Sequence, residues 1–471
     1  MKSRVPKVLH TLCGRSMLGH ALAAARELQP QCLVVVAGHG RELVTAEVAR
    51  IAPDATVVVQ ERLGGTGHAV RMVTEVLGAF NGPVVVTYGD MPLLRAETLA
   101  ALVAEHAARH NGVTVLTAEV ASPFGYGRIV RDEQGALAEI VEEADATPAQ
   151  RAVSEINSGC YAFDGALLGD AIKRVATSNA QGQEYLTDVV AILCGDGHPV
   201  GAMIAADADE IQGVNDRVQL AQVRCALNQR LLAAWMRSGV TIVDPATTWV
   251  DADVTIGQDT EIRPGTHLEG STAIGSRAQV GPDCTLVDTK VGDDAAISYA
   301  VAKSAEIGAG ASVGPFAYLR PGAKIGPGAH IGTYVELKNA TVGEGSKVPH
   351  LTYVGDADIG RDANIGAGTI FANYDGVAKH HTTVGDGAFV GSDSVLIAPV
   401  TIGDGAYTAA GSAISEDVPS GSLGVARGRQ HNSRGWTERR RPDTKSAAAA
   451  ARARERETHT QGATEQEEGA Q

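Results

Sequence analysis

The chain has 471 residues, of which 44% are hydrophobic and 20% are charged, so it is long enough for two or three domains and has the composition of a globular protein. Its net charge of -15 argues against general binding to nucleic acid, which requires a basic surface. The six cysteines form no CxxC pair, no apolar run approaches the length of a membrane helix, and the N-terminus lacks a signal-peptide core. We therefore expect a cytoplasmic protein with reduced thiols, no zinc site and no membrane partner.

Residues 1–215 alternate between patterns typical of buried strands and of helices. Strands are expected at 32–37, 55–60, 83–88 and 112–118. Helical patterns lie between them, at 16–28, 67–77 and 96–110. This alternation predicts an α/β domain with a doubly wound sheet, parallel at its centre, whose ligands bind beyond the carboxyl ends of the strands.

Two loops at such strand ends carry residues suited to binding phosphate and metal. The first is rich in glycine at 64–67, where backbone N–H groups can approach a ligand at the start of the next helix. The second places Asp90 directly after a strand, which suits a metal ligand. Taken alone, a glycine-rich turn explains the first loop, and an Asx turn or helix cap explains the second equally well.

Residues 216–238 read as one helix with an apolar stripe at helical spacing. The stripe consists of Val218, Val223, Leu227, Leu231, Leu232 and Trp235. We interpret it as a packing surface and the helix as the connection between two domains, ended by Gly239. The predicted boundaries are 1–216 for the first domain and 217–239 for the linker helix.

A period of six residues organises the chain from 254 to 418. Aliphatic residues recur from Ile256 and Ile262 onward to Ile414 with few slips, and Gly often follows them. A period of six fits neither an ordinary strand nor an α-helix. It is typical of a parallel β-helix, in which each hexad makes a short strand and a corner around one apolar column. We assign 240–436 to this domain.

The hexad register breaks between Ile365 and Val384, where a solenoid wall has to loop outward. This segment is rich in Asn, Lys and His, so we predict that it forms the wall of a site. His350 lies shortly before the break. An unperturbed imidazole has a pKa of about 6.5 and is suited to accept a proton from an attacking amine. A solvated corner residue is the alternative for a single His.

Residues 437–471 begin with Arg439-Arg440-Arg441-Pro442 and continue into an Ala-rich and then a Glu, Gln and Thr-rich tail. From 443 onward the tail has no apolar residue larger than Ala, so it cannot bury a core, and we expect it to be disordered. The stretch 446–457 is the part of this tail with helix-forming composition.

The first domain resembles the nucleotide-sugar pyrophosphorylase family. The motifs that carry the resemblance are PKVLH at 6–10, LGGTGHA at 63–69, YGDMPL at 88–93, FGYGRIV at 124–130, IVEEADAT at 140–147, INSG at 156–159 and GVNDR at 213–217. Joined to a hexapeptide β-helix, such a domain is similar to a family of bacterial bifunctional enzymes. These enzymes transfer acetyl from acetyl-CoA to glucosamine 1-phosphate and uridylyl from UTP to N-acetylglucosamine 1-phosphate, for cell-wall synthesis.

The resemblance implies roles for the loop residues of the first domain. Lys7 would neutralise phosphate charge, and Asp90 and Asn215 would hold Mg²⁺. The residues implied to contact uracil and its ribose are Gln60, Gly65 and Thr66. The residues implied to bind the sugar are Gly127, Glu142 and Asn157. Phosphoryl transfer of this kind depends on positioning and on charge neutralisation rather than on covalent help from the protein.

The resemblance also implies an acetyltransferase site on the β-helix, with His350 as the base. Arg320 and Lys338 would bind the sugar phosphate, and Tyr353, Asn364 and Lys379 would complete the sugar site. Asn373 and Tyr374 would lie beside the acetyl group. The coenzyme A residues would be Ser392, Ala410 and Arg427. Members of this family have a left-handed β-helix and are homotrimers with active sites between neighbouring β-helices, so we expect the same here.

One departure from the family concerns the first strand and its Gly-rich, Arg-containing loop of the form LxAGxGTRM, which precede PKVLH in the family. Here Met1-Lys2-Ser3 stands where that loop ends. We expect neighbouring strands to lack a partner as a result, and the natural protein to be longer by roughly twenty residues, the size of a strand and its loop. Two alternatives to a bifunctional enzyme stay open on the sequence alone: an acetyltransferase only, and a non-catalytic regulatory subunit.

Overall fold

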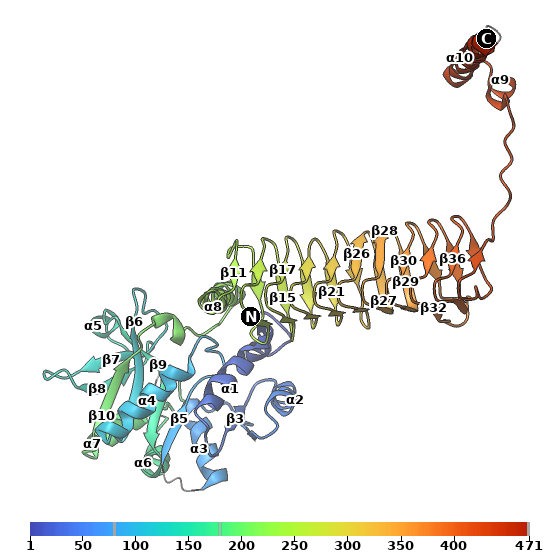
Figure 1. Cartoon of the computed structure of the whole chain (residues 1–471). Helices are drawn as coiled ribbons and strands as arrows, with labels where there is room; N and C mark the ends of the chain where they lie inside the picture. Colours follow the sequence, from blue (N-terminus) through green and yellow to red (C-terminus); the bar gives the residue numbers. More distant parts are fainter. Residues whose placement is uncertain (79–81, 178, 180, 469–471) are drawn as a thin grey trace.

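The computed structural model describes residues 1–78, 82–177, 179 and 181–468. Figure 1 shows an N-terminal α/β domain, a connecting helix, a long β-helix and a C-terminal extension that ends in helices. None of the described helices combines the length and the hydrophobicity that crossing a lipid bilayer demands.

The N-terminal domain contains two sheets rather than one. The larger has the order β10-β6-β9-β7-β8, with β5 on the other side of β9, and the smaller pairs β3 with β4 in parallel. The strands are β3 (Val34–Ala37), β4 (Thr56–Val59), β5 (Pro83–Val86), β6 (Val113–Glu119), β7 (Arg128–Arg131), β8 (Leu137–Val141), β9 (Glu155–Asp164) and β10 (Val200–Ile204). Among the described strands, β3 pairs only with β4 and β5 only with β9.

The centre of the larger sheet differs from the parallel arrangement that the sequence predicts. Strand β9 runs antiparallel to both β5 and β6, whereas β10 runs parallel to β6. The alternation of strands and helices fixes the direction of β3 to β6, but β9 follows the β7–β8 hairpin rather than a crossover helix. Nine of ten β9 residues are buried, so this strand forms the middle of the core.

Seven helices accompany the sheets in the described part of this domain, and three of them, α1, α3 and α4, lie where the sequence predicts helices. They are α1 (Met17–Glu27), α2 (Arg41–Ile51), α3 (Thr66–Leu77), α4 (Ala96–Arg109), α5 (Pro148–Arg151), α6 (Gly165–Ala171) and α7 (Asp188–Gly195), with short 3-10 turns η1 (Lys7–Leu9), η2 (Ile172–Arg174) and η3 (Ala208–Ile211). Helix α1 begins where Ser16 accepts a hydrogen bond from Gly19 N at 3.0 Å. Helix α3 begins in the predicted glycine-rich loop, which places its positive end there.

The two domains are joined by α8 (Arg217–Arg237) and by the hairpin β1 (Thr11–Leu12) and β2 (Arg15–Ser16). The buried Asn228 amide of α8 donates to Thr248 O at 2.8 Å and accepts from Val250 N at 3.0 Å, in the first coil of the β-helix. The hairpin contributes a bond from Ala252 N to Cys13 O at 2.9 Å. The Asn228 contacts fix the linker helix predicted at 217–239 to the β-helix, and the hairpin ties the first domain to the same coil.

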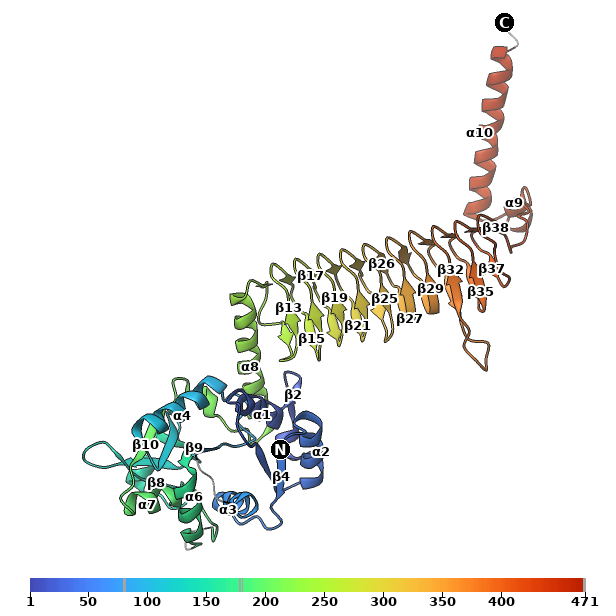
Figure 2. The same ribbon diagram turned by 60° about the horizontal axis from the view of Figure 1, so that its bottom comes forward.

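The β-helix is a prism with three walls, each built of parallel strands from successive coils (Figures 1 and 2). Wall A comprises β11 (Thr241–Ile242), β14 (Glu261–Ile262), β17 (Gln279–Val280), β20 (Ala296–Ile297), β23 (Ser312–Val313), β26 (His330–Thr333), β28 (Lys347–His350), β30 (Asn364–Ile365), β33 (Phe389–Val390), β36 (Tyr407–Thr408) and β38 (Leu423–Gly424). The inward residues of this wall form a buried column, as the hexad period predicts.

Walls B and C follow along each coil. Wall B comprises β12 (Trp249–Val250), β15 (His267–Glu269), β18 (Thr285–Val287), β21 (Val301–Lys303), β24 (Tyr318–Leu319), β31 (Ile370–Ala372), β34 (Val395–Ile397) and β37 (Ala413–Ile414). Wall C comprises β13 (Thr255–Ile256), β16 (Ala273–Ile274), β19 (Lys290–Val291), β22 (Glu306–Ile307), β25 (Lys324–Ile325), β32 (Thr382–Val384) and β35 (Val400–Ile402). Strands β27 (Glu336–Val342) and β29 (Tyr353–Ile359) span both walls.

The C-terminal segment contains α9 (Trp436–Arg440) and α10 (Lys445–Glu468). The sequence predicts disorder over 437–471, whereas the structure describes helix over most of it. Ala, Arg and Glu are strong helix formers, which accounts for α10 without a packed core. Figures 1 and 2 show α10 standing away from the β-helix, in keeping with a tail that buries no core.

Candidate active sites

The first cluster lies at the carboxyl end of β5, where three predicted residues meet. Lys7 Nζ lies 2.5 Å from Asp90 Oδ2 and donates to Asn215 Oδ1 at 2.9 Å. The Asn215 loop is held in place because Val214 N donates to Asp90 O at 3.2 Å. The structure thus brings together one cation and two oxygen ligands from segments more than 80 residues apart in the chain.

The residues implied to bind the sugar form a second group nearby. A Cβ at Gly127 would lie 3.5 Å from both Asn157 Cβ and Glu142 Oε2, so the three residues are neighbours. Thr187 Oγ1 donates to Glu142 Oε1 at 3.3 Å. Burial raises the pKa of Glu142, although the Thr187 hydrogen bond opposes the shift. A desolvated carboxylate of this kind is poised to accept hydrogen bonds from hydroxyl groups.

The glycine-rich loop is pinned by the segment before α7. Gly67 N donates to Glu184 O, and Glu184 N donates to Gly64 O, both at 2.8 Å. Gly65 has φ of +105° and a Cβ there would lie 2.5 Å from Glu184 O, so only Gly fits. Gln60 Nε2 donates to Gly65 O at 3.2 Å. Thr66 Oγ1 is already engaged, since it accepts from Leu186 N at 3.1 Å.

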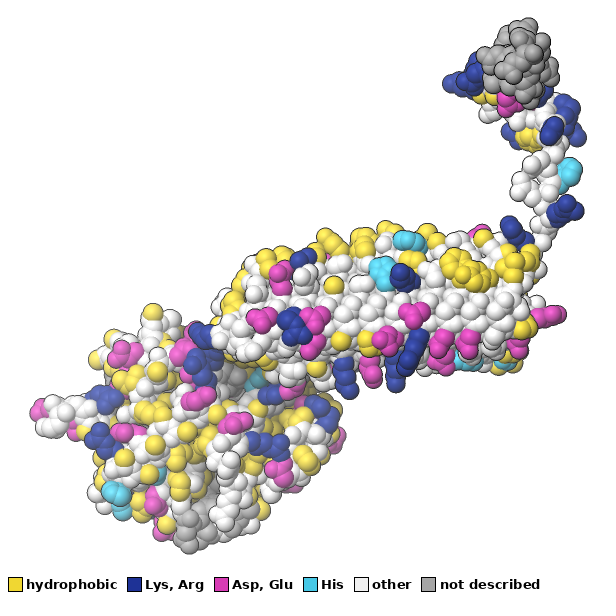
Figure 3. Space-filling model, in the orientation of Figure 1, with side chains coloured by type: hydrophobic (Ala, Val, Ile, Leu, Met, Phe, Trp, Pro, Cys, Tyr) yellow, Lys and Arg dark blue, Asp and Glu magenta, His cyan; other side chains and the backbone are white. Residues whose placement is uncertain are grey.

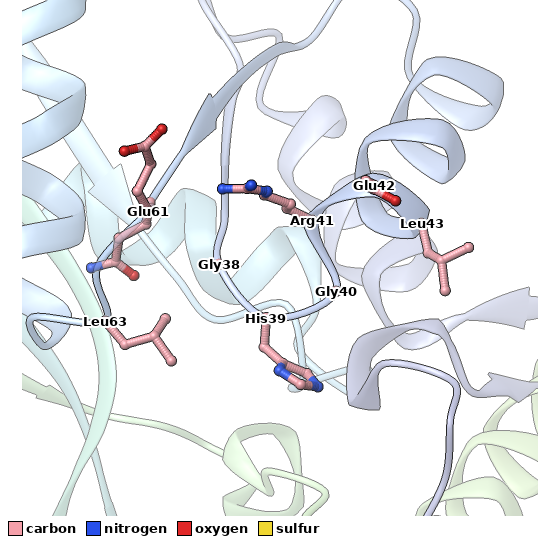
Figure 4. Close-up of a pocket in the computed structure, with 9 residues that line it drawn as sticks. Gly38, His39, Gly40, Arg41, Glu42, Leu43, Glu61 and Leu63 are labelled. Carbon is pink, nitrogen blue, oxygen red and sulfur yellow. The ribbon is translucent and has the colours of Figure 1, made fainter.

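A hollow of about 400 Å³ opens beside Gln60, between the loop after β3 and the strand end after β4 (Figure 4). Figure 4 shows Arg41 reaching from the start of α2 in the direction of Glu61, with His39 on the same loop. Arg41 and His39 belong to none of the motifs recognised in the sequence. The signal that could have found them is their place after the strand 32–37, at the ligand-binding edge of the sheet.

On wall B, cationic side chains gather around one carboxylate. Lys338 Nζ lies 3.1 Å from Asp356 Oδ2, and Asn339 and Asn373 also donate to Asp356. Burial alone would raise the pKa of Asp356, but these hydrogen bonds together lower it. A hydrogen bond to Lys338 and the charge of Lys338 lower the pKa of Lys379.

Arg320 and Tyr353 complete this part of wall B. Arg320 Nη1 donates to Glu336 Oε1 at 3.0 Å, and Glu336 is paired in register with Tyr353. Asp356 itself was missed from the sequence, because its role depends on the pairing of β27 with β29. In that register Lys338 lies beside Gly355, one residue from Asp356.

The predicted break in the register is a loop between β31 and β32, which projects from the β-helix in Figure 2. Tyr374 and Lys379 are bridged across its base, and Tyr374 is 61% exposed. His380 Nε2 lies 2.7 Å from Asp375, and His381 Nε2 lies 3.0 Å from Asp358. His380 is thereby engaged within the loop, and His381 holds the loop to β29.

His350 lies at the edge between walls A and B, hereafter the A–B edge, and begins a row of small residues. Gly368 N donates to His350 O at 3.2 Å, Asp393 N to Ala367 O at 2.7 Å, and Gly411 N to Ser392 O at 2.9 Å. His350, Ala367, Ser392 and Ala410 therefore occupy equivalent places in successive coils. Arg427 follows β38 at the end of this row.

A second histidine, His330, was not predicted as a site residue and lies near this edge on wall A. Ser312 Oγ and His330 Nδ1 are 2.8 Å apart. Burial lowers the pKa of His330, and the charges of His350 and Lys347 lower it further, so His330 is disposed to stay neutral.

The structure does not bring all predicted acetyltransferase residues onto one surface. Arg320, Lys338 and Tyr353 face outward from wall B, whereas Asn364 faces outward from wall A. Outward normals on two walls of a prism diverge from their common edge. A ligand lying on wall B of one copy therefore cannot contact Asn364 of the same copy.

Two families match the chain. The nucleotidyl transferase family matches residues 2–252, and the bacterial transferase hexapeptide (six repeats) family matches 304–339 and 381–416. The fold and the two clusters thus define the class: a nucleotidyltransferase domain fused to a hexapeptide-repeat transferase.

Relatives that match this chain over nearly the full length of both chains identify a narrower family within this class. The bifunctional protein GlmU of Thermobifida fusca (strain YX) is 61% identical over 451 residues, which cover 95% of this chain and 93% of that protein. Bifunctional protein GlmU of Streptomyces avermitilis is 60% identical over 449 residues, with the same coverage of both chains. The chain belongs to the family of the bifunctional protein GlmU. A solved UDP-glucose pyrophosphorylase complexed with UDP-glucose covers 48% of this chain and 91% of its own at 14% identity and a TM-score of 0.40, a likeness too slight to support an inference.

Proposed function

We infer that this chain catalyses two successive reactions of UDP-N-acetylglucosamine synthesis. The first transfers acetyl from acetyl-CoA to glucosamine 1-phosphate, and the second transfers uridylyl from UTP to N-acetylglucosamine 1-phosphate. The observation that carries this function is the presence of both clusters in one chain of a family whose members are called bifunctional. It also favours two activities over the acetyltransferase-only and regulatory alternatives.

In the first domain, a phosphate oxygen of the sugar phosphate attacks the α-phosphorus of UTP, and the bond to the leaving pyrophosphate breaks. The protein residues hold the two substrates and neutralise their phosphate charge, and they form no covalent bond with either substrate. Lys7 offers one positive charge at the carboxyl end of β5. The sugar hydroxyls would be held by Glu142, Asn157 and the backbone at Gly127. The uracil and ribose of UTP would be held by Gln60, Gly65 and Thr66.

Asp90 and Asn215 fit Mg²⁺ by the chemistry of their donors. Both present oxygen, which this ion prefers, and both already surround a cation, the Lys7 ammonium. Mg²⁺ sites with one or two protein oxygens are common where substrate phosphates supply further ligands. When bound, the ion would neutralise phosphate charge. Lys7 would then turn from Asp90 toward a phosphate.

On the β-helix, the amine of glucosamine 1-phosphate attacks the thioester carbonyl of acetyl-CoA. A C–N bond forms, the C–S bond breaks, and the coenzyme A thiolate leaves. His350 accepts the proton that the amine loses. The cations Arg320, Lys338 and Lys379 would bind the sugar phosphate together with Tyr353. Asp356 holds Lys338 and Asn373 in place.

The remaining predicted residues extend this site toward the C-terminus. Asn373 and Tyr374, in the projecting loop, would lie beside the acetyl group. Ser392, Ala410 and Arg427 would bind coenzyme A along the A–B edge, where the row of small residues leaves room for an extended chain. Since Asn364 lies on wall A, it would reach a ligand on wall B only of a neighbouring copy. This division of the site supports a homotrimer with sites between copies.

We expect the protein to act in the cytoplasm, on the grounds of its cysteines and its substrates. All six cysteines are free, which suits the reducing cytoplasm. The substrates are small phosphorylated sugars, UTP and acetyl-CoA, and the product is a precursor of peptidoglycan.

Two assays on the purified chain test this function. We expect thiol release from acetyl-CoA when glucosamine 1-phosphate is added, and pyrophosphate release from UTP when N-acetylglucosamine 1-phosphate and Mg²⁺ are added. Each assay omits the other co-substrate, so each reports one site. If only thiol is released, the chain is an acetyltransferase alone. If neither thiol nor pyrophosphate is released, a non-catalytic regulatory subunit is favoured.

A further inference from the structure

Two consecutive carboxylates, Glu142 and Glu143, follow β8 and have opposite surroundings. Burial raises the pKa of Glu142, which lies beside Gly127 in the sugar-binding group described above. A hydrogen bond from Arg128 lowers the pKa of Glu143, so this side chain stays ionised. Figure 3 shows acidic and basic side chains close together over β7 and β8. The two neighbouring carboxylates are therefore suited to different tasks.

Arg128 is a charged residue inside the sheet, where it begins β7. Its side chain is 2% exposed, and its neighbours in register are Val141 of β8 and Ile156 of β9. Arg128 Nη2 donates to Glu143 Oε2 at 2.7 Å. Among the described residues, Arg128 Nε finds no hydrogen-bond acceptor, so the guanidinium depends on the acceptors at its other two nitrogens. A buried charge without its partner is costly, and Glu143 is the partner that Arg128 requires.

Both members of this ion pair also bind the backbone of the loop that precedes β7. Glu143 Oε2 accepts a hydrogen bond from Gly125 N at 3.2 Å, and Arg128 Nη1 donates to the carbonyl oxygen of Tyr126. Arg151 of α5 holds the same segment from the other side, since its Nη2 donates to Glu143 O at 3.3 Å. The Arg128–Glu143 pair thus fixes the position of the loop 125–127 relative to the sheet.

The loop that the pair holds lies at the first active site. Gly127 O accepts a hydrogen bond from Asn157 N at 2.9 Å, which places the loop against the other sugar-binding residues. Burial raises the pKa of Tyr126, and a hydrogen bond to the backbone at Gly213 opposes this shift. Gly213 belongs to the segment that also carries Asn215. The loop 125–127 therefore connects the sugar-binding group to the cluster that would hold Mg²⁺.

We propose that Arg128 and Glu143 are positioning residues for uridylyl transfer, which hold the loop 125–127 in the place where it binds N-acetylglucosamine 1-phosphate. The proposal rests on the uridylyltransferase function proposed above. Neither side chain binds the substrate itself, because Arg128 is buried and Glu143 Oε2 already accepts from two donors. Loss of the pair lets Gly127 move away from Glu142 and weakens binding of the sugar phosphate. The glycine-rich loop at 64–67, which would hold the uracil and ribose, is unaffected.

The test measures pyrophosphate release by the full chain with Glu143→Ala or Glu143→Gln. In the alanine variant we expect the KM for N-acetylglucosamine 1-phosphate to rise by about tenfold, the effect of one lost hydrogen bond. The KM for UTP and kcat should change by less than about twofold, because the pair supports binding of the sugar phosphate and not the chemical step. Gln keeps an acceptor for Arg128 and Gly125, so the second variant should recover most of the affinity.

A further variant guards against a failure to fold, because Glu143→Ala leaves the Arg128 charge buried without its partner. The double variant Arg128→Met with Glu143→Leu removes both charges, a replacement that often leaves the stability of a protein unchanged. Its circular dichroism and the hydrogen exchange of β9 should equal those of the unaltered chain. The KM for the sugar phosphate should still be raised, and hydrogen exchange at 125–127 should be faster.

The matched control is Glu105→Ala, which removes a carboxylate that pairs with Arg109 at 3.1 Å on α4 of the same domain. It should leave the KM for both substrates unchanged. A folded double variant with an unaltered KM for the sugar phosphate, or with equal rises in the KM for both substrates, would overturn the proposal. If the unaltered chain releases no pyrophosphate, the uridylyltransferase function fails, whereas hydrogen exchange at 125–127 still decides whether the pair holds the loop.

Discussion

Replacing His350 by alanine should reduce thiol release from acetyl-CoA by about 10²- to 10⁴-fold, the usual contribution of a general base. The amine of glucosamine 1-phosphate has to lose a proton as the C–N bond forms, and the His350 imidazole at the A–B edge is suited to accept it. The KM for both substrates should change little, because neither the phosphate-binding cations nor the coenzyme A row is altered. Initial rates over a range of substrate concentrations separate the two effects.

The matched control is His381→Ala, because His381 is also a histidine near this site but is held by Asp358 at 3.0 Å. It should retain thiol release within a few fold. Pyrophosphate release by His350→Ala should equal that of the unaltered chain, which verifies that the protein is folded. Thiol release by His350→Ala at the rate of the unaltered chain would show that His350 is not the general base.

The second large effect is expected from Asp90→Asn, which should lower pyrophosphate release by at least about 100-fold and raise the Mg²⁺ concentration needed for half-maximal rate. The amide keeps the shape of the carboxylate but removes the negative charge that lies 2.5 Å from Lys7 Nζ. Mg²⁺ would lose its one charged protein ligand, and the phosphates would lose the neutralisation on which the transfer depends. Pyrophosphate release titrated with Mg²⁺ gives both quantities.

A structural role of Asp90 would lower the rate at every Mg²⁺ concentration without shifting the titration. Asp196→Asn is the matched control, since Asp196 lies in the same domain in an ion pair with Arg174 at the surface. It should leave the titration unchanged. Thiol release by Asp90→Asn should be normal, because the β-helix is untouched. An unshifted Mg²⁺ titration would show that Asp90 does not bind the ion.

The β-helix was predictable because its period specifies which residue faces inward. Ile262, Leu268, Val280 and Leu286 were selected by spacing alone, and all four are fully buried. A hexad needs no long-range information, since each one repeats the same strand and corner. The break between Ile365 and Val384 was predictable for the same reason, and the structure places a projecting loop there.

The N-terminal sheet was harder to predict because strand order and direction depend on contacts distant in the chain. Patterns of apolar residues located β3, β4, β5 and β6, but they do not indicate that β9 inserts antiparallel between β5 and β6. Likewise, Asp356 becomes important only through the register that places Lys338 beside Gly355. The stacking of Phe316 on Tyr334 was not predicted, because the sequence alone does not reveal which corner residues of successive coils lie against each other.

The central claim is that one chain carries two independent active sites that act in sequence, and mixing two inactive variants tests it most directly. His350→Ala and Asp90→Asn are each incubated alone, and then together, with glucosamine 1-phosphate, acetyl-CoA, UTP and Mg²⁺. Neither variant alone should make UDP-N-acetylglucosamine, whereas the mixture should make it, because N-acetylglucosamine 1-phosphate released by one variant is used by the other. A mixture that releases thiol but makes no UDP-N-acetylglucosamine would contradict the claim.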